Sequence, residues 1–107
     1  MAGAILVSEK NGVSFKSLDF DYIIEKIRAH FNSGDNVILN EIYSPVDEGG
    51  MSFISLVEQT GDGFNAFFRA ASLAYGDEIR AGVLSGRKAE WDKLLIALRS
   101  DSRINSN

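Results

Sequence analysis

The stretch AILVSEKNGVSFKSLDFDYIIEKIRAHF, residues 4–31, predicts both kinds of secondary structure from which the fold is built. Its first half contains two short segments, Ala4–Ser8 and Val13–Ser17, in which apolar and polar residues alternate as they do in β-strands. Between them lies Glu9-Lys10-Asn11-Gly12, a composition typical of a tight turn. We therefore expect a β-hairpin at the start of the chain.

The length of this turn follows from which residues must share a face. A two-residue Asn-Gly turn would pair Phe15 with Ser8 and mix apolar with polar side chains. A three-residue loop with Gly12 in the left-handed position pairs Phe15 with Val7 instead. We favour this loop because it gathers four apolar residues on one side of the hairpin: Ile5, Val7, Val13 and Phe15.

The second half of the stretch predicts a helix over about Phe20–Phe31. Its apolar residues recur with the spacing of one helical face: Phe20, Ile23, Ile24, Ile27 and Phe31. Ser17 or Asp19 is expected to cap the start of this helix, and Gly34 is a natural stop at its end.

Two further strands are expected, Asn36–Tyr43 and Met51–Glu58. The first has apolar residues on both faces, which predicts a central strand covered on both sides. Pro45 and the Gly49-Gly50 pair confine the connection between the two strands to a loop, because neither residue type suits a strand interior.

The next segment, Phe64–Tyr75, predicts a helix that is apolar on almost every side, with Arg69 as its only charge. Such a helix should be buried on more than one side, and Gly76 is expected to end it. Residues Asp77–Leu84 fit either a short strand or an irregular crossover, and the sequence leaves this open.

A last helix is expected to begin at Ser85 or Gly86 and to bury one stripe: Trp91, Leu94, Leu95 and Leu98. The polar tail, residues 100–107, is expected to fray. We thus expect an α/β fold of the α+β type, a single small domain over residues 1–107. Its mixed or mainly antiparallel sheet would have four to five strands packed with three helices.

Charge is distributed unevenly along the chain. Residues 1–62 hold ten acids and four bases (−6), whereas residues 63–107 hold five acids and seven bases (+2). Between Arg28 and Arg69 there is no lysine or arginine, yet six carboxylates occur there: Asp35, Glu41, Asp47, Glu48, Glu58 and Asp62. Such a chain can steer a cationic partner, but it lacks the positive footprint that direct nucleic-acid binding needs.

Few residues of the sequence suggest a catalytic or metal-binding site. The absence of cysteine excludes disulfides and zinc-thiolate sites, and fits a reducing cytoplasm. His30, the single histidine, falls in the last turn of the expected helix, where a structural role is favoured over a catalytic one. The acids at Asp35, Asp47, Glu48 and Asp62 lack the regular spacing of a calcium loop. We expect no catalytic, cofactor or metal site, and no enzyme activity.

The aromatic residues suggest more than one role. The stripe within Phe64–Tyr75 is expected to fill the core, since a domain this small needs it, although it could also line a small-molecule pocket. Tyr22 and Tyr43 border acidic segments instead, and a tyrosine rimmed by carboxylates is a reasonable interface anchor. The apolar runs are too short to span a bilayer, and no secretory signal is expected.

Three segments carry a resemblance to a known group of proteins: GDNVILNEIY (34–43), DEGG (47–50), and the ending from EWDKLL (90–95) through RSDSR (99–103). In these, and in its size and acidity, the chain resembles small immunity proteins that accompany bacterial polymorphic and contact-dependent growth inhibition toxins. The resemblance implies a cytoplasmic protein that binds one cognate toxin domain and occludes its active site. Many such toxins are basic nucleases, whose substrate charge an acidic inhibitor can mimic.

We therefore expect a monomeric toxin inhibitor that binds neither membrane nor nucleic acid directly. Six residues are expected to bind the toxin: Asp35, Glu41, Tyr43, Asp47, Glu48 and Asp62. The alternative is a small ligand-sensing or regulatory module, in which the helix Phe64–Tyr75 lines the pocket.

Overall fold

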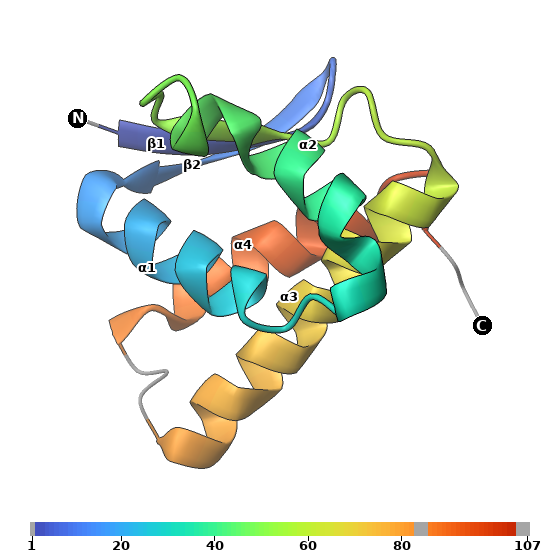
Figure 1. Ribbon diagram of the computed structural model, residues 1–107. Helices are drawn as coiled ribbons and strands as arrows, with labels where there is room; N and C mark the ends of the chain where they lie inside the picture. The colour runs from blue at the N-terminus through green and yellow to red at the C-terminus, as the bar shows by residue number, and fades with distance from the viewer. Residues whose placement is uncertain (1, 83–85, 105–107) are drawn as a thin grey trace.

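The computed structural model describes residues 2–82 and 86–104, which form an α+β fold (Figure 1). Its strands are β1 (Ala2–Ser8), β2 (Asn11–Lys16) and β3 (Phe53–Ser55). Its α-helices are α1 (Ser17–Arg28), α2 (Asn36–Asp47), α3 (Gly61–Ala81) and α4 (Lys88–Arg99), and the short 3-10 helix η1 covers Ser33–Asp35. The described residues thus contain three strands and four α-helices, where four to five strands and three helices were expected.

The sheet has the order β2-β1-β3, with β1 in the centre. β1 pairs with β2 in antiparallel and with β3 in parallel orientation, so the sheet is mixed, one of the two arrangements that the sequence predicts. Backbone bonds from Ala4 N to Ser52 O (3.0 Å) and from Leu56 N to Leu6 O (2.8 Å) flank the short β3 ladder. The strand predicted over Met51–Glu58 is therefore real but shorter.

The hairpin has the predicted faces but a different turn. Gly12 pairs with Leu6 and Asn11 pairs with Ser8, so the register shifts at Val7 in the first strand. Among the described residues only Gly50 and Gly82 have a positive φ, and the three-residue loop with a left-handed Gly12 is wrong. The extra residue in β1 shifts the alternation of side-chain faces by one position. The three-residue loop was expected to have the same effect. As a result the four predicted apolar residues are all buried: Ile5, Val7, Val13 and Phe15.

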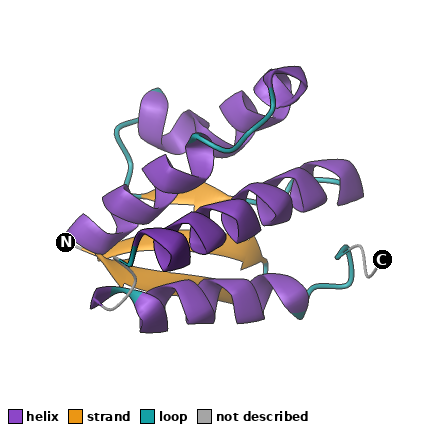
Figure 2. Cartoon of the chain, turned by 90° about the horizontal axis from the view of Figure 1, so that it is seen from below, coloured by secondary structure: helices purple, strands orange, loops and turns teal. Residues whose placement is uncertain are grey.

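α1, α3 and α4 lie on one face of this sheet, and α2 lies along its β3 edge (Figure 1). α1 and α4 pack on β1 and β2, α2 packs on β3, and α3 packs across α1 and α4. Figure 2 views α1, α3 and α4 in front of the strands and α2 beyond the β3 edge, so the core lies between the sheet and the helices. The largest fully buried side chains come from every layer: Trp91, Tyr43, Phe20, Phe64, Phe67, Ile5, Ile23, Ile24, Ile27, Ile42, Ile54 and Leu56.

α1 buries four of the five residues of its predicted stripe, Phe20, Ile23, Ile24 and Ile27, whereas Phe31 lies beyond its end. It begins at Ser17, its N-cap residue Lys16 makes no side-chain capping bond, and it ends before Ala29 rather than near Gly34. The stripe lies so close to β1 that a Cβ on Gly3 would stand 2.2 Å from Cγ of Phe20. Packing against the sheet, rather than a capping side chain, therefore secures the start of this helix.

α2 replaces the strand predicted over Asn36–Tyr43, and this part of the prediction is wrong. Ile42 and Tyr43 are buried, and further apolar residues packed against the core follow helical spacing: Ile38, Leu39 and Val46. Pro45 lies inside the helix instead of in a loop, and it cannot donate to Glu41 O. Ser44 Oγ donates to that oxygen at 3.3 Å and makes up for the missing bond.

α3 is longer than its sequence predicts. It continues through Gly76 and ends at Gly82, whose φ of 70° suits a glycine C-cap. Residues 77–81 of the undecided segment are therefore helical, while 83–84 lie outside the described residues. The start expected at Ser85 also lies outside them, and α4 begins at Lys88 rather than at Gly86. Within the described ranges, no helix combines the length and the apolar character needed to span a lipid bilayer.

Candidate functional site

Arg103 anchors the chain end from Asp101 to Ile104, which was expected to fray. Its guanidinium contacts Asp101 through Nε and Nη2, both at 2.9 Å, and it donates to three backbone oxygens: Leu56 O (2.6 Å), Gln59 O (2.8 Å) and Val7 O (2.7 Å). All five of its N–H donors are thus used. The group also lies 4.5 Å from the ring centre of Phe64. This part of the tail is ordered by hydrogen bonds that join it to β1 and to the end of β3.

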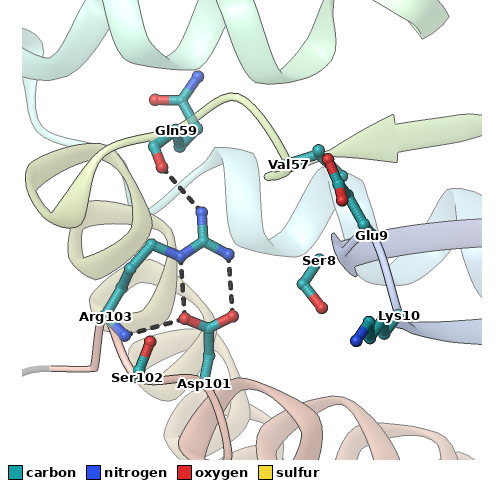
Figure 3. A pocket seen from close by; sticks show the side chains of 8 residues that line it. All are labelled: Ser8, Glu9, Lys10, Val57, Gln59, Asp101, Ser102 and Arg103. Carbon is teal, nitrogen blue, oxygen red and sulfur yellow. Dashed lines mark hydrogen bonds and ion pairs between the residues drawn. The ribbon is translucent and has the colours of Figure 1, made fainter.

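A hollow of about 430 Å³ lies beside this anchor (Figure 3). It is lined by Ser8, Glu9, Lys10, Val57, Gln59, Asp101, Ser102 and Arg103. The Arg103 guanidinium lowers the pKa of the Asp101 carboxyl, and the carboxylate raises the pKa of Arg103. The charges of Asp101 and Arg103 thus compensate each other at the wall of the hollow.

Tyr43 lies inside the core and not at the surface. Its side chain is fully buried, and its hydroxyl donates to Ile24 O at 2.5 Å. Burial raises the pKa of this hydroxyl, which stays protonated. The prediction that Tyr43 is an exposed interface anchor is therefore wrong, because the strand that would have exposed it is a helix whose inner face carries it.

Asp47 is already neutralised by a residue of α1. Arg28 donates to its two oxygens at 2.9 and 2.8 Å, and this pairing lowers the pKa of Asp47. The same guanidinium lies 4.4 Å from the ring centre of Tyr43 and 3.1 Å from Glu25. Asp47 thus fastens the end of α2 to the end of α1.

Asp35 and Asp62 lie at one groove between α2 and α3. Its volume is about 790 Å³, and it is lined by Asp35, Ile38, Gly61, Asp62, Asn65, Ala66, Phe68, Arg69 and Ser72. Arg69 Nη2 donates to Asp35 at 2.7 Å, whereas Asp62 forms no ion pair within the described part of the chain. We call this feature the α2–α3 groove.

Glu41 and Glu48 lie on the outer face of α2. A separation of seven residues returns to nearly the same side of a helix, so the two carboxylates share a face with Val37, which is 73% exposed. Neither glutamate has an ion-pair partner among residues 2–82 and 86–104. We define the outer face of α2 as Val37, Asn40, Glu41, Ser44 and Glu48.

The five predicted acids, Asp35, Glu41, Asp47, Glu48 and Asp62, therefore lie along α2 and at the start of α3 and do not form one cluster; we call them the acidic row. Asp35 and Asp47 flank a helix of 12 residues, about 18 Å long at 1.5 Å per residue. In the described ranges no three His, Asp or Glu side chains come close enough to hold a metal ion. The row leaves three carboxylates available to a partner: Glu41, Glu48 and Asp62.

The sequence reasoning missed the partners of the other two acids. Arg28 and Arg69 are the residues that bound the stretch without basic residues, and each pairs with an acid inside it. Their positions at its two ends were a visible signal, but the pairings depend on how the helices fold back on one another.

His30 and Tyr22 take structural roles. His30 Nε2 lies 2.6 Å from Asp77 Oδ2 and ties the residues after α1 to α3. The centre of the Tyr22 ring lies 3.9 Å from the Arg87 guanidinium, and the neighbouring Glu78 raises the pKa of the Tyr22 hydroxyl. Neither residue faces a candidate reaction centre.

The aromatic residues of α3 mainly fill the core. Phe64 and Phe67 are fully buried, while Phe68 and Tyr75 are half-buried. The stripe of α4 is buried as predicted: Trp91, Leu94, Leu95 and Leu98. The alternative in which α3 lines a ligand pocket thus retains only Phe68, in the α2–α3 groove, and Tyr75, in a small hollow beside α4.

Comparison with known proteins gives two similarities over almost the whole chain. The chain is 33% identical over 104 residues to a protein named immunity protein CdiI of Burkholderia pseudomallei, which covers 97% of this chain and 95% of that protein. It also matches a chain in the solved complex of a CdiA-CT toxin from Burkholderia pseudomallei E479 with its cognate CdiI immunity protein. That match has a TM-score of 0.91 and 31% identity, over 96% of this chain and 99% of the other. No family model matches the chain.

Proposed function

Since this chain belongs to the family of CdiI immunity proteins, we propose that it binds a cognate CdiA-CT toxin domain and neutralises it. The observation that carries the proposal is the near-complete structural match to a chain of a toxin–immunity complex, with a TM-score of 0.91. The protein acts as a binding inhibitor and not as an enzyme.

The free carboxylates support a basic toxin domain as the partner. Glu41, Glu48 and Asp62 have no cation beside them in the described structure, so an approaching cationic surface does not have to displace one. Long-range attraction of this kind raises the association rate and weakens as salt rises. A nuclease is a natural partner, because the surface that binds phosphates is basic.

The outer face of α2 is the contact surface that we propose. Val37 lies among the carboxylates of this face, and Met51, just beyond the helix, is 52% exposed. These two apolar side chains supply contact area that loses water on binding, a role in which the buried Tyr43 cannot serve. A row of carboxylates beside them mimics the phosphates of a nucleic acid, so the inhibitor occludes the active site. It does so in the cytoplasm, where the substrate of a nuclease is found.

Titration calorimetry with the purified cognate toxin domain tests this proposal. In the titration we expect one inhibitor to bind one toxin. In a cleavage assay, nucleic-acid cleavage should stop at equal concentrations. In a rapid-mixing experiment, the association rate should fall steeply with salt. The variant Glu41→Lys with Glu48→Lys should weaken binding at least about tenfold, since it places like charges opposite a basic surface. Glu9→Lys with Asp21→Lys, two exposed changes outside α2 that alter the net charge equally, is the matched control.

Two outcomes would contradict different parts of the proposal. No binding by the wild-type protein would contradict the inhibitor role itself. Normal binding by the double variant, with an unchanged salt dependence, would leave that role standing and exclude the outer face of α2 as the contact surface.

A further inference from the structure

We propose that the α2–α3 groove receives an arginine side chain of the toxin domain, held by Asp35 and Asp62 and resting on Phe68. This inference deepens the proposed function and rests on it, because it names the partner group that one end of the acidic row would bind. The groove combines two carboxylates from different helices with an apolar floor.

Two elements bring these groups to the same groove. Asp35 is the N-cap residue of α2, and Asp62 lies in the first turn of α3, so both carboxylates sit at helix starts that are otherwise far apart in sequence. Ile38 and Phe68 line the groove while they pack against the core, and Ala66 is buried beneath it. The floor is therefore fixed by the fold and does not have to form on binding.

The protein's own Arg69 shows that the groove accepts a guanidinium. It reaches Asp35 through a single hydrogen bond of 2.7 Å, and its side chain is still 47% exposed. Arg28 and Arg103 are held differently, the first by two bonds to Asp47 and a tyrosine ring, the second by all five donors. Of these three arginines, Arg69 is therefore the one that a partner can displace most easily.

The count of charges leaves the groove one cation short. Arg69 compensates Asp35, but no cation within the described ranges pairs with Asp62. An incoming arginine could bind Asp62 directly and share or replace Arg69 at Asp35. The charges of the groove and of this occupant are then complementary.

The shape of the groove favours arginine over lysine. A guanidinium is flat, so it can lie against the ring of Phe68, which already has the Arg99 guanidinium 6.0 Å from its centre. Its N–H groups can then point to carboxylates on either side. Its aliphatic stem can cover Ile38 and Ala66, which are apolar. A lysine would supply a single strongly hydrated point charge and gain less from this floor.

Removal of Arg69 gives the first test, by affinity for the purified toxin domain. We expect Arg69→Gln to tighten binding about threefold to tenfold, because the incoming arginine no longer competes for Asp35. Arg80→Gln is the matched control, since Arg80 is also an arginine of α3 that pairs with one aspartate, Asp77. If both variants tighten binding equally, only net charge matters and the proposal is overturned.

A second test identifies the arginine itself. Asp62→Asn should weaken binding about tenfold, and Phe68→Leu, which keeps the core filled, should weaken it less. Combining Asp62→Asn with replacement of each exposed toxin arginine by lysine should reveal one arginine whose effect depends on Asp62. If no arginine couples to Asp62 while wild-type binding stays normal, the groove proposal fails and the inhibitor role stands. If the wild-type protein does not bind at all, both fail together.

Discussion

Arg28 and Asp47, 19 residues apart in sequence, form a two-point ion pair that joins the end of α1 to the end of α2. In this pair the Arg28 guanidinium also lies over the ring of Tyr43, 4.4 Å from the ring centre. The burial of Ile42 and Tyr43 turns the inner face of α2 to the core, the ion pair joins the two helix ends, and Glu41 and Glu48 are left on the outside. The surface available to a partner follows from this internal arrangement.

Loss of the Arg28–Asp47 pair should lower stability modestly. Because the Asp47 side chain is 41% exposed, solvent screens the interaction, and we expect Asp47→Asn to lower the free energy of unfolding by about 1 kcal/mol or less. Urea unfolding measures the difference. Glu48→Gln, beside it and without an ion pair, is the control and should change stability by less than about 0.5 kcal/mol. Equal effects of the two variants would show that the pair contributes nothing.

Arg103→Lys should destabilise the fold although it keeps the positive charge. Lysine cannot replace the flat guanidinium that bonds Asp101 and three backbone oxygens, so some of those buried acceptors lose their partner. We expect a loss of about 2 to 3 kcal/mol by urea unfolding. Arg99→Lys, an exposed change on α4, should be almost neutral. A neutral Arg103→Lys would mean that the tail is not held as described.

The contribution of Asp101 should depend on pH in one direction. Arg103 lowers the pKa of Asp101 in the folded state below its ordinary value of 3.8. A lowered folded pKa stabilises the protein above the unfolded pKa, and this stability is lost as pH falls below about 3.8 through the folded pKa. The stability difference between wild type and Asp101→Asn should thus be constant near neutral pH and shrink in acid. A difference that grows in acid would reverse the sign and contradict the ion pair.

Tyr43→Phe separates a core role from a contact role. The change removes a buried hydroxyl and the hydrogen bond that it donates to Ile24 O, so we expect stability to fall by about 1 to 2 kcal/mol. The affinity for the toxin domain should stay the same, because the side chain is fully buried. Thermal unfolding and calorimetry on the same sample measure both. Unchanged stability with weaker binding would place Tyr43 at the interface after all.

Two glycines of α3 should respond in opposite ways to alanine. Gly76 lies in the middle of the helix, and an added Cβ would meet only Arg80, at 3.5 Å, so Gly76→Ala should stabilise by about 0.5 to 1 kcal/mol. Gly82 has a φ of 70°, and Gly82→Ala should destabilise by about 1 kcal/mol. Chemical unfolding of the pair tests this. A stabilising Gly82→Ala would mean that α3 does not end there.

Local patterns were sufficient for the two strands of the hairpin, though not for its turn, and for three of the helices. The alternation over Ile5–Val7 and Val13–Phe15 and the stripe from Phe20 to Ile27 both place apolar residues on the faces that the structure buries. These predictions succeed because a period of two or of 3.6 residues is a property of the segment itself. Helix ends succeed less well: packing rather than Ser17 or Asp19 starts α1, and α3 passes through Gly76.

Asn36–Tyr43 shows where local patterns fail. The run Val37-Ile38-Leu39 has strong strand propensity, and Pro45 suggests a loop, yet α2 extends across both. Contacts between α2 and β3, together with the Arg28–Asp47 pair, outweigh these preferences of a few tenths of a kcal/mol per residue. The conversion of strand to helix also moved Tyr43 from the surface to the core.

The acidic character of the chain is a matter of composition, visible without any fold, and so is the family resemblance that it helped to carry. The composition does not show which carboxylates remain without an ion-pair partner. Asp47 and Asp35 are compensated by Arg28 and Arg69, partners 19 and 34 residues away, while Glu41, Glu48 and Asp62 are left to the solvent. Only the tertiary structure could make this division, because ion pairs form between neighbours in space, and the sequence lists neighbours along the chain.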